Sequence, residues 1–336
     1  MIKRNQVFKL INGNSNDMLS LMDEGSKRQF FSLLALSDIK LRKNIGLSKN
    51  DTFGIEIEFQ DANLNNLGKS IRENKLFKSW DFRNDISLFN GFEFVSSICT
   101  NDEVFWNDID KMCSILQDNA RIGIDCGGHV HVGSHVIGGA RESWLNLALL
   151  WSIYEKIIYR FAYNDYLTPR PNILKYASPM AEIFRDLILL INDENNDLMK
   201  LIVNSTPKKS SAIYFGNLVD FDKVLNKNTI EFRCPNGTFE AAIWQNNINF
   251  FVKFLKRCRA NEFDTEFILY RYENYKKISS IREYNSIYPD LALEFSDIVF
   301  DNNIDKVYFL KQYFKDFTVG EDCLQKSKRF VKKISK

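Results

Sequence analysis

Three short stretches place side chains that can bind cations or transfer protons at alternating positions of the chain. In the first, residues 125–135 read Asp-Cys-Gly-Gly-His-Val-His-Val-Gly-Ser-His and hold all three histidines of the 336 residues. His129 and His131 alternate with valines, the period of a half-buried strand, so both imidazoles are expected on one face. A strand with ordinary surface histidines is the alternative that this stretch alone leaves open.

The second stretch, residues 52–60, alternates phenylalanine and isoleucine with Gly54, Glu56, Glu58 and Gln60. A strand with this pattern buries its apolar face and presents both carboxylates, about 7 Å apart, from the other face. Two like charges at this distance repel each other unless a cation or water screens them. A solvated sheet face is the alternative, and for an isolated Glu-x-Glu pattern it is the better interpretation.

The third stretch, residues 229–234, alternates Glu231 and Arg233 with apolar side chains. A carboxylate can ligate a cation while a neighbouring guanidinium grips phosphoryl oxygens, but an exposed salt bridge of little energetic weight fits the same pattern. Predicted strands at 77–82 and 91–98 bring Asp85 and Glu93 towards the same polar face. The alternatives are a turn-capping aspartate and an exposed strand glutamate.

The remaining pattern supplies the elements that must position these side chains. Apolar periodicity and turn residues predict strands and helices in alternation, with a loop at 168–176 whose two prolines fix the backbone around Arg170. The further expected elements are a strand at 6–11, helices within 17–43, a loop or short helix at 61–75, a helix beginning at 101–103, helices at 142–163, 181–191, 197–203 and 240–259, a strand at 211–219, and helical patterns beyond 261.

Composition restricts the class of protein. The 45 basic and 43 acidic residues give a net charge of +2, too balanced to indicate nucleic acid or an acidic membrane as a partner. The six cysteines are scattered without a Cys-x-x-Cys pair, no secretory pattern precedes them, and the apolar run 145–154 is too short to span a bilayer. We therefore expect a cytoplasmic enzyme with reduced thiols, and a solvated basic tail at 326–336.

Four segments in order, 54–59, 80–97, 127–132 and 231–233, resemble the amidoligase family. This family belongs to the carboxylate-amine ligase superfamily of glutamine synthetase and glutamate-cysteine ligase. Each motif is weak alone, but their order makes the resemblance specific over roughly residues 50–255. Weaker landmarks lie around Arg170 and Asn217. Cys126 departs from the threonine or serine usual in relatives, a change that affects the surroundings of the ligands more than the ligands.

The resemblance implies an α+β fold like the catalytic domain of glutamine synthetase. An antiparallel sheet would curve into a half-barrel with helices packed on its convex side. Residues 51–260 would form the catalytic domain, residues 1–50 an N-terminal appendage, and residues 261–336 a helical extension packed on the catalytic domain.

The resemblance also implies an activity. ATP would phosphorylate a small-molecule or peptide carboxylate, and an amine would attack the acyl phosphate to form an amide, isopeptide-like bond. Two or three Mg²⁺ ions, or Mn²⁺, would assist, and the enzyme could form an oligomer. Hard cations and an arginine suit this chemistry because several anions must approach one another.

The roles implied by motif position divide the site residues into sets. Glu56, His129 and Glu231 would hold the metal nearer the ATP phosphates, and Glu58, Asp85 and Glu93 the metal near the substrate carboxylate. Arg233, Asp85 and Glu93 would be catalytic, and Arg233, Arg170, Asn217 and His131 would bind the nucleotide. His135 would lie outside the site.

Three alternatives remain open at this point. A His-x-His strand with nearby carboxylates could hold Zn²⁺ for hydrolysis, although the excess of carboxylates favours Mg²⁺. A phosphotransferase could use the same fold without ligation, and a non-catalytic scaffold could retain it.

Overall fold

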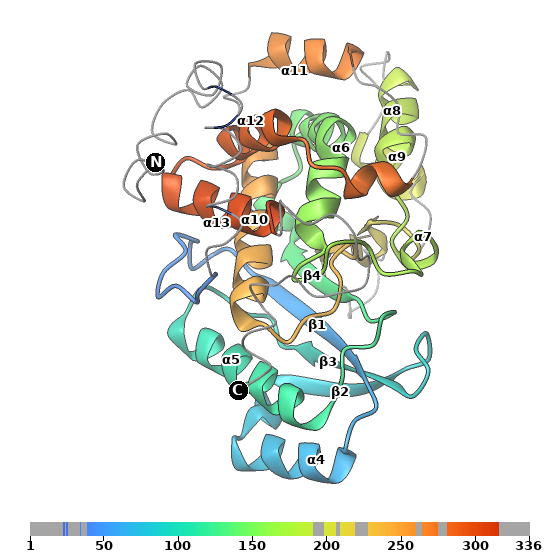
Figure 1. The fold of residues 1–336 in the computed structure, drawn as a ribbon. Coiled ribbons are helices and arrows are strands. Elements are labelled where there is room, and N and C mark those ends of the chain that lie inside the picture. The colour runs from blue at the N-terminus through green and yellow to red at the C-terminus, as the bar shows by residue number, and fades with distance from the viewer. Residues whose placement is uncertain are drawn as a thin grey trace.

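The protein is an α+β structure built on one open, six-stranded antiparallel sheet, as a computed structural model shows (Figure 1). The structure describes residues 39–190, 198–205, 209–218, 228–259, 264–274 and 281–315, together with Asp23, Gly25 and Leu34. The strand order is β2-β3-β1-β4-β6-β5, and the sheet does not close. The strands are β1 Phe53–Gln60, β2 Trp80–Asp85, β3 Gly91–Ser96, β4 Gly128–Gly133, β5 Ile213–Tyr214 and β6 Thr229–Phe232.

The register of the strands brings the three stretches of the sequence side by side. Glu56 of β1 lies opposite His129 of β4, and His131 lies opposite Glu231 of β6. On the other side of β1, Glu58 lies opposite Glu93 of β3. Because side chains alternate along a strand, all six groups project from the same face of the sheet.

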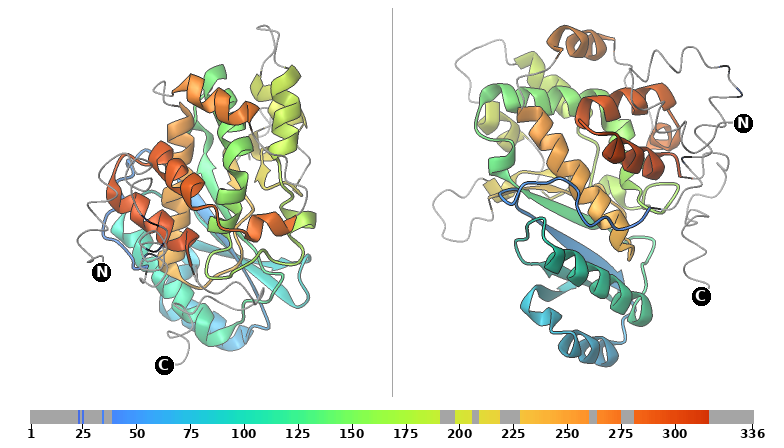
Figure 2. Two further views of the ribbon diagram at one scale, coloured as in Figure 1. Left: turned by 45° about the horizontal axis from the view of Figure 1, so that its top comes forward. Right: turned by 90° about the vertical axis from the view of Figure 1, so that its left-hand side faces the viewer.

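Helices cover the opposite face and surround the sheet (Figures 1 and 2). None of the described helices is long and apolar enough to cross a membrane. The α-helices are α4 Leu64–Glu73, α5 Glu103–Asn119, α6 Arg141–Ala162, α7 Ile173–Tyr176, α8 Ala181–Leu190, α9 Leu198–Ser205, α10 Ala241–Arg259, α11 Thr265–Glu273, α12 Pro289–Val299 and α13 Asn303–Tyr313, and the 3₁₀ turns are η1 Leu76–Lys78, η2 Ser134–Val136, η3 Gly216–Leu218 and η4 Ile281–Asn285.

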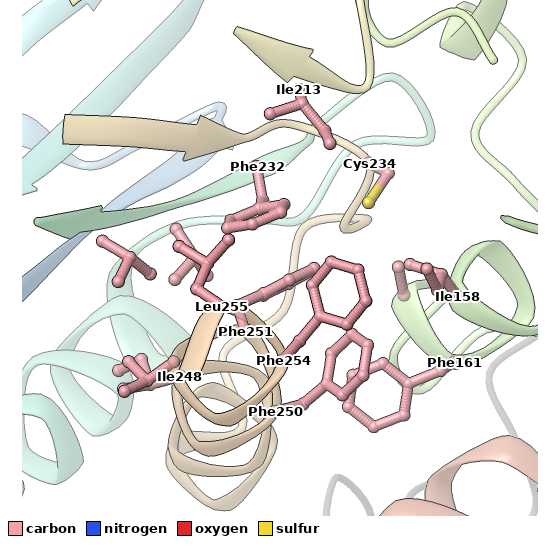
Figure 3. Close-up of a cluster of buried hydrophobic side chains, with 14 of the residues drawn as sticks. Ile158, Phe161, Ile213, Phe232, Cys234, Ile248, Phe250, Phe251, Phe254 and Leu255 are labelled. Atoms are coloured by element: carbon pink, nitrogen blue, oxygen red, sulfur yellow. The ribbon is translucent and has the colours of Figure 1, made fainter. Parts of the chain in front are cut away.

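The core lies between the apolar sheet face and helices α5, α6 and α10. Phe232 of β6 stacks on Phe251 of α10 with 4.1 Å between ring centroids (Figure 3). Trp151 of α6 also stacks on the Phe232 ring. Phe53 of β1 packs edge-to-face against Phe105 of α5. Burying each such ring contributes about 1.5–3 kcal/mol, so the helices hold the sheet from its apolar side.

Two predicted strands differ from the observed ones. The strand expected at 77–82 begins only at Trp80, because Lys75 adopts a left-handed conformation (φ 59°) and a 3₁₀ turn follows. The strand expected at 211–219 is reduced to Ile213–Tyr214 since η3 turns the chain at Gly216. The predicted strand at 6–11, most of the helical segment 17–43 and the tail 326–336 lie outside the described residues.

A buried aspartate joins three parts of the helical layer. Asp305 of α13 accepts hydrogen bonds from Arg42 Nη1 at 2.6 Å and Asn249 Nδ2 at 2.8 Å, and pairs with Lys253 Nζ of α10. Burial would raise the pKa of Asp305, but the bonds and charges of Lys253 and Arg42 outweigh it and hold the pKa below its usual range. The segment before β1 and helix α13 are thus fixed to α10 by one charge.

We expect Asp305→Asn to destabilise the fold by about 3 kcal/mol, because two largely buried cations lose their counter-charge. Asp301→Asn is the matched control, because Asp301 also pairs with an arginine, Arg257, but its own side chain is 86 % exposed. This control variant should change stability by less than about 0.5 kcal/mol. Urea unfolding of both variants measures the difference. Equal effects would contradict the role given to Asp305.

Candidate active site

The glutamates of the polar sheet face are buried. Glu56, Glu58 and Glu231 are only 8 %, 7 % and 4 % exposed, which excludes the solvated-face interpretation of the Glu-x-Glu pattern. Each carboxylate has lost most of its hydration, so positive groups must compensate for their charge. The neighbouring strands β4 and β6 supply these groups.

His129 lies among the three buried glutamates. Its Nδ1 is 2.6 Å from Glu56 Oε2 and 3.5 Å from Glu231 Oε1, and its Nε2 is 3.2 Å from Glu58 Oε1. The Nε2 contact is close but not aligned as a hydrogen bond, so this buried nitrogen has no hydrogen-bond partner among the described residues. An imidazole nitrogen left in this position is a candidate ligand for a cation.

His131 also contacts Glu56. Its Nε2 is 3.0 Å from Glu56 Oε1, and its Nδ1 is 3.3 Å from Thr229 Oγ1. Glu56, His131 and Glu231 each offer one atom within 4.8 Å of the others, a spacing that can hold a metal ion. The family resemblance assigns His131 to nucleotide binding and leaves open which histidine is the metal ligand, and the geometry offers both imidazoles as candidate ligands.

The histidines set the charge of the cluster. Burial would raise the pKa of Glu56, but the hydrogen bonds and charges of His129 and His131 hold it well below its usual range. Burial opposes ionisation of Glu231 in the same way, and the two histidines with Arg233 lower its pKa. Both glutamates are therefore anionic at neutral pH.

Arg233 and Asn217 complete this end of the cluster. Arg233 Nη1 donates a short hydrogen bond to Glu231 Oε1, and Nε donates to the carbonyl oxygen of Tyr176 at 3.2 Å. Asn217 Nδ2 donates to Glu231 Oε2 at 3.3 Å. The side-by-side placement of carboxylate and guanidinium follows the alternation in the sequence.

Arg170 lies beneath the polar face. Its Nη1 donates to the carbonyl oxygen of Pro235 at 2.5 Å and its Nη2 to that of Arg233 at 2.9 Å. Its side chain also packs on Gly127, where an added Cβ would come within 2.9 Å of the guanidinium carbon. These two hydrogen bonds and the contact with Gly127 tie the Arg170 side chain to the backbone that positions Arg233 and Gly127.

The second half of the cluster lies where β1 ends. Gly127 N–H donates to Glu58 Oε2 at 2.5 Å, a contact that the two glycines before His129 permit. Burial raises the pKa of Glu93 to about 7, and the nearby carboxylates add to the shift. Asp85 is half-buried and its Oδ1 accepts the N–H of Ser87 at 2.8 Å, so Asp85 does cap a turn.

A cavity of about 330 Å³ adjoins the opposite end of the cluster. Gly54 forms part of its floor, whereas the space beside Gly133 is filled by Thr52 and His135. His131 and Thr229 join the cavity to the glutamates. His135, whose Nε2 bonds to the carbonyl oxygen of Asn50 at 2.7 Å, lies at its wall. Sequence reasoning missed this cavity, although Gly54 in the alternating strand is its signal. The other lining residues are Thr52, Phe53, Ile55, Asp81, Arg83, Val95, Ser96, Ser97, Ile98 and Asn228.

The fold and site define an α+β protein with a buried cluster of carboxylates and imidazoles on one face of an open antiparallel sheet. A family model described as "Putative amidoligase enzyme" matches residues 78–255, slightly more than half of the chain, and the chain belongs to this family. A search of curated proteins found no match. The matched segment runs from η1 to α10, so β1 with Glu56 and Glu58 precedes it in sequence but pairs between two of its strands.

Glu93→Gln should change how stability depends on pH. The folded-state pKa of Glu93, about 7, exceeds its unfolded value, so the native state binds more protons and the wild type loses stability as the pH rises from about 4.5 to about 7. The variant lacks this loss. In the absence of divalent cations we expect the variant and the wild type to have equal free energies of unfolding near pH 4. Near pH 8 the variant should be more stable than the wild type by about 1–2 kcal/mol, after allowance for solvent screening.

Urea unfolding across this pH range measures the effect, with the exposed Glu73→Gln as control. A difference between wild type and Glu93→Gln that is constant with pH would show that the charge of Glu93 is not buried.

Proposed function

We propose that the protein is an ATP- and Mg²⁺-dependent carboxylate-amine ligase that forms an amide through an acyl phosphate. The observation that carries this proposal is the gathering of three buried glutamates from strands β1 and β6 around His129 of β4, in a chain of the amidoligase family. The substrates would be a small-molecule or peptide carboxylate and an amine.

The residues fit divalent cations. Oxygen ligands predominate, which favours Mg²⁺, and the imidazoles also suit Mn²⁺. Glu56 and Glu231 with His129 or His131 would hold one ion, and Glu58, Asp85 and Glu93 a second, with room for a third left open. Bound there, the ions would neutralise phosphate oxygens and polarise the phosphoryl group.

The cavity beside His131 is the proposed place of the nucleoside. Its volume lies at the lower end of the range for small-molecule sites, and its glycine floor can accept a flat ring. A nucleoside there would direct its phosphates towards Glu56, Glu231 and Arg233. Arg233 would grip phosphoryl oxygens and Asn217 would orient Glu231, while Arg170 would hold the backbone of Arg233 in place.

The reaction needs no side-chain nucleophile. An oxygen of the substrate carboxylate attacks the γ-phosphorus and ADP leaves, and the amine nitrogen then attacks the acyl carbon and phosphate leaves. Arg233 neutralises the anions that must approach one another. Asp85 and Glu93, at the other end of the cluster, are the carboxylates placed to take the proton that the amine loses.

The rival functions give different results in one assay. A zinc hydrolase would act without nucleotide and lose activity with a zinc chelator, and a phosphotransferase would consume ATP without forming an amide. Phosphate release with Mg-ATP against amino acids, peptides and polyamines, followed by mass spectrometry of the product, separates them.

Glu56→Gln and Glu231→Ala should each lower ATP consumption by a factor of about 10² or more, because each removes a buried ligand charge. Arg233→Lys should also impair turnover since a lysine cannot form the bidentate fork. Phosphate release measures the loss, with Glu73→Gln as control and thermal unfolding as a check on the fold. Wild-type turnover in Glu56→Gln would refute the metal assignment.

Gly54→Val should weaken Mg-ATP binding about tenfold or more, because its side chain would fill the floor of the cavity. A Cβ at Gly54 would come within 3.2 Å of Ser96 Oγ, a contact that a small shift of the serine relieves. Gly139→Ala is the control, since a Cβ there meets nothing within 4 Å. Titration calorimetry measures both, and unchanged affinity in Gly54→Val would exclude the cavity as the nucleoside site.

A further inference from the structure

The turn between β2 and β3 exposes two large apolar side chains. Ile86 is 100 % exposed and Phe89 is 89 % exposed, although Leu88 between them is buried. Leu88 packs so closely on Gly91 that a Cβ added to Gly91 would lie 2.1 Å from the Cβ of Leu88. The turn thus buries one apolar residue and presents two others.

The conformation of this turn is fixed by hydrogen bonds. Asp85 Oδ1 accepts the N–H of Ser87 at 2.8 Å, and Gln60 Nε2 donates to the carbonyl oxygen of Phe89 at 2.7 Å. Asn90 takes a left-handed conformation (φ 49°) and its carbonyl accepts the N–H of Asp61. Ile86 and Phe89 are therefore held outward by an anchored turn.

The turn borders the carboxylate-rich end of the site. Asp85 directly precedes it and Glu93 follows it on β3. Gln60, which holds Phe89, also pairs through its backbone with Arg121, at the start of the loop that leads to the histidine strand. An apolar surface joined to a reactive end in this way is placed to contact the rest of a substrate whose carboxylate reacts there.

Two neighbouring segments add to this surface. Ile124 in the loop before β4 is 55 % exposed, and Leu174 of α7 is 54 % exposed. Asn172 Nδ2 donates to the carbonyl oxygen of Asp125 at 3.2 Å and so joins the two segments. We call Ile86, Phe89, Ile124 and Leu174 the apolar rim.

The rim also carries positive charge and polar gaps. The side chain of Arg121 is 77 % exposed and lies 3.9 Å from Asp61, and Lys175 is exposed beside Leu174. The apolar side chains stand singly, separated by groups such as Ser87 and Asn90. That spacing suits a peptide, whose apolar side chains alternate with polar backbone, better than a continuous alkyl chain.

We propose that the apolar rim selects the carboxylate substrate: a peptide whose reacting carboxylate is flanked by apolar side chains. This inference rests on the proposed ligase function. The peptide carboxylate lies at the Glu58 and Glu93 end, and its apolar neighbours are buried against Ile86 and Phe89.

A binding assay tests the rim without turnover. Fluorescein-labelled peptides ending in Leu-Leu or Ser-Ser, and peptides with a glutamate between two leucines or two serines, are titrated with protein, Mg²⁺ and a non-hydrolysable ATP analogue. We expect the wild type to bind the leucine peptides about tenfold or more tightly than their serine counterparts. The double variant Ile86→Ser and Phe89→Ser should lose this preference. Val104→Ser, at a 70 % exposed position on α5, should retain it.

Equal binding of leucine and serine peptides by the wild type would overturn the proposal, and so would a preference that survives in the double variant. A second assay tests the ligase function separately, with hydroxylamine as the amine. ATP phosphorylates the peptide carboxylate and releases ADP, hydroxylamine nitrogen attacks the acyl carbon, and phosphate leaves with formation of a hydroxamate. A binding preference without hydroxamate from any donor would support the rim and refute the ligase function.

Discussion

The structure depends on the burial of like charges on one strand. Glu56 and Glu58 lie on the same face of β1 and are almost fully withdrawn from water, where their repulsion is strong. Their partners are the imidazoles of His129 and His131 on the adjacent strand and, for Glu231, the guanidinium of Arg233 one strand further. This requirement explains why β1 lies in the middle of the sheet: only a central strand has neighbours on both sides that can contribute partners and further ligands.

The alternation of side chains separates this charged face from the support that holds it. Each strand that contributes a glutamate or histidine to the polar face also packs aromatic or aliphatic side chains against the layer of helices α5, α6 and α10. Rigid packing on one face fixes the backbone, and the backbone fixes the distances between ligands on the other face. Arg170 extends the same principle, since its contacts with backbone carbonyls hold the turn after β6.

Sequence patterns predicted the strands that carry the ligands because alternation is a local property. They did not predict the register that places Glu58 opposite Glu93, since pairing depends on contacts between distant segments. The burial of the glutamates was equally hidden, because it depends on what covers the sheet face. The start of β2 was wrong by three residues because the left-handed Lys75 has no strong local signal. The cavity is lined by Gly54 and His131 of neighbouring strands, which only the paired sheet brings together.

The pairing of Asp305 with Arg42 and Lys253 has a consequence for synthesis on the ribosome. The two cations precede their shared partner in the chain, and Lys253 precedes it by 52 residues. During translation the segment before β1 and helix α10 therefore emerge with positive charges that their final positions cannot yet neutralise. All six strands and α10 precede α13 in the chain, so Asp305 reaches its two cationic partners only after the rest of the acidic face has been synthesised.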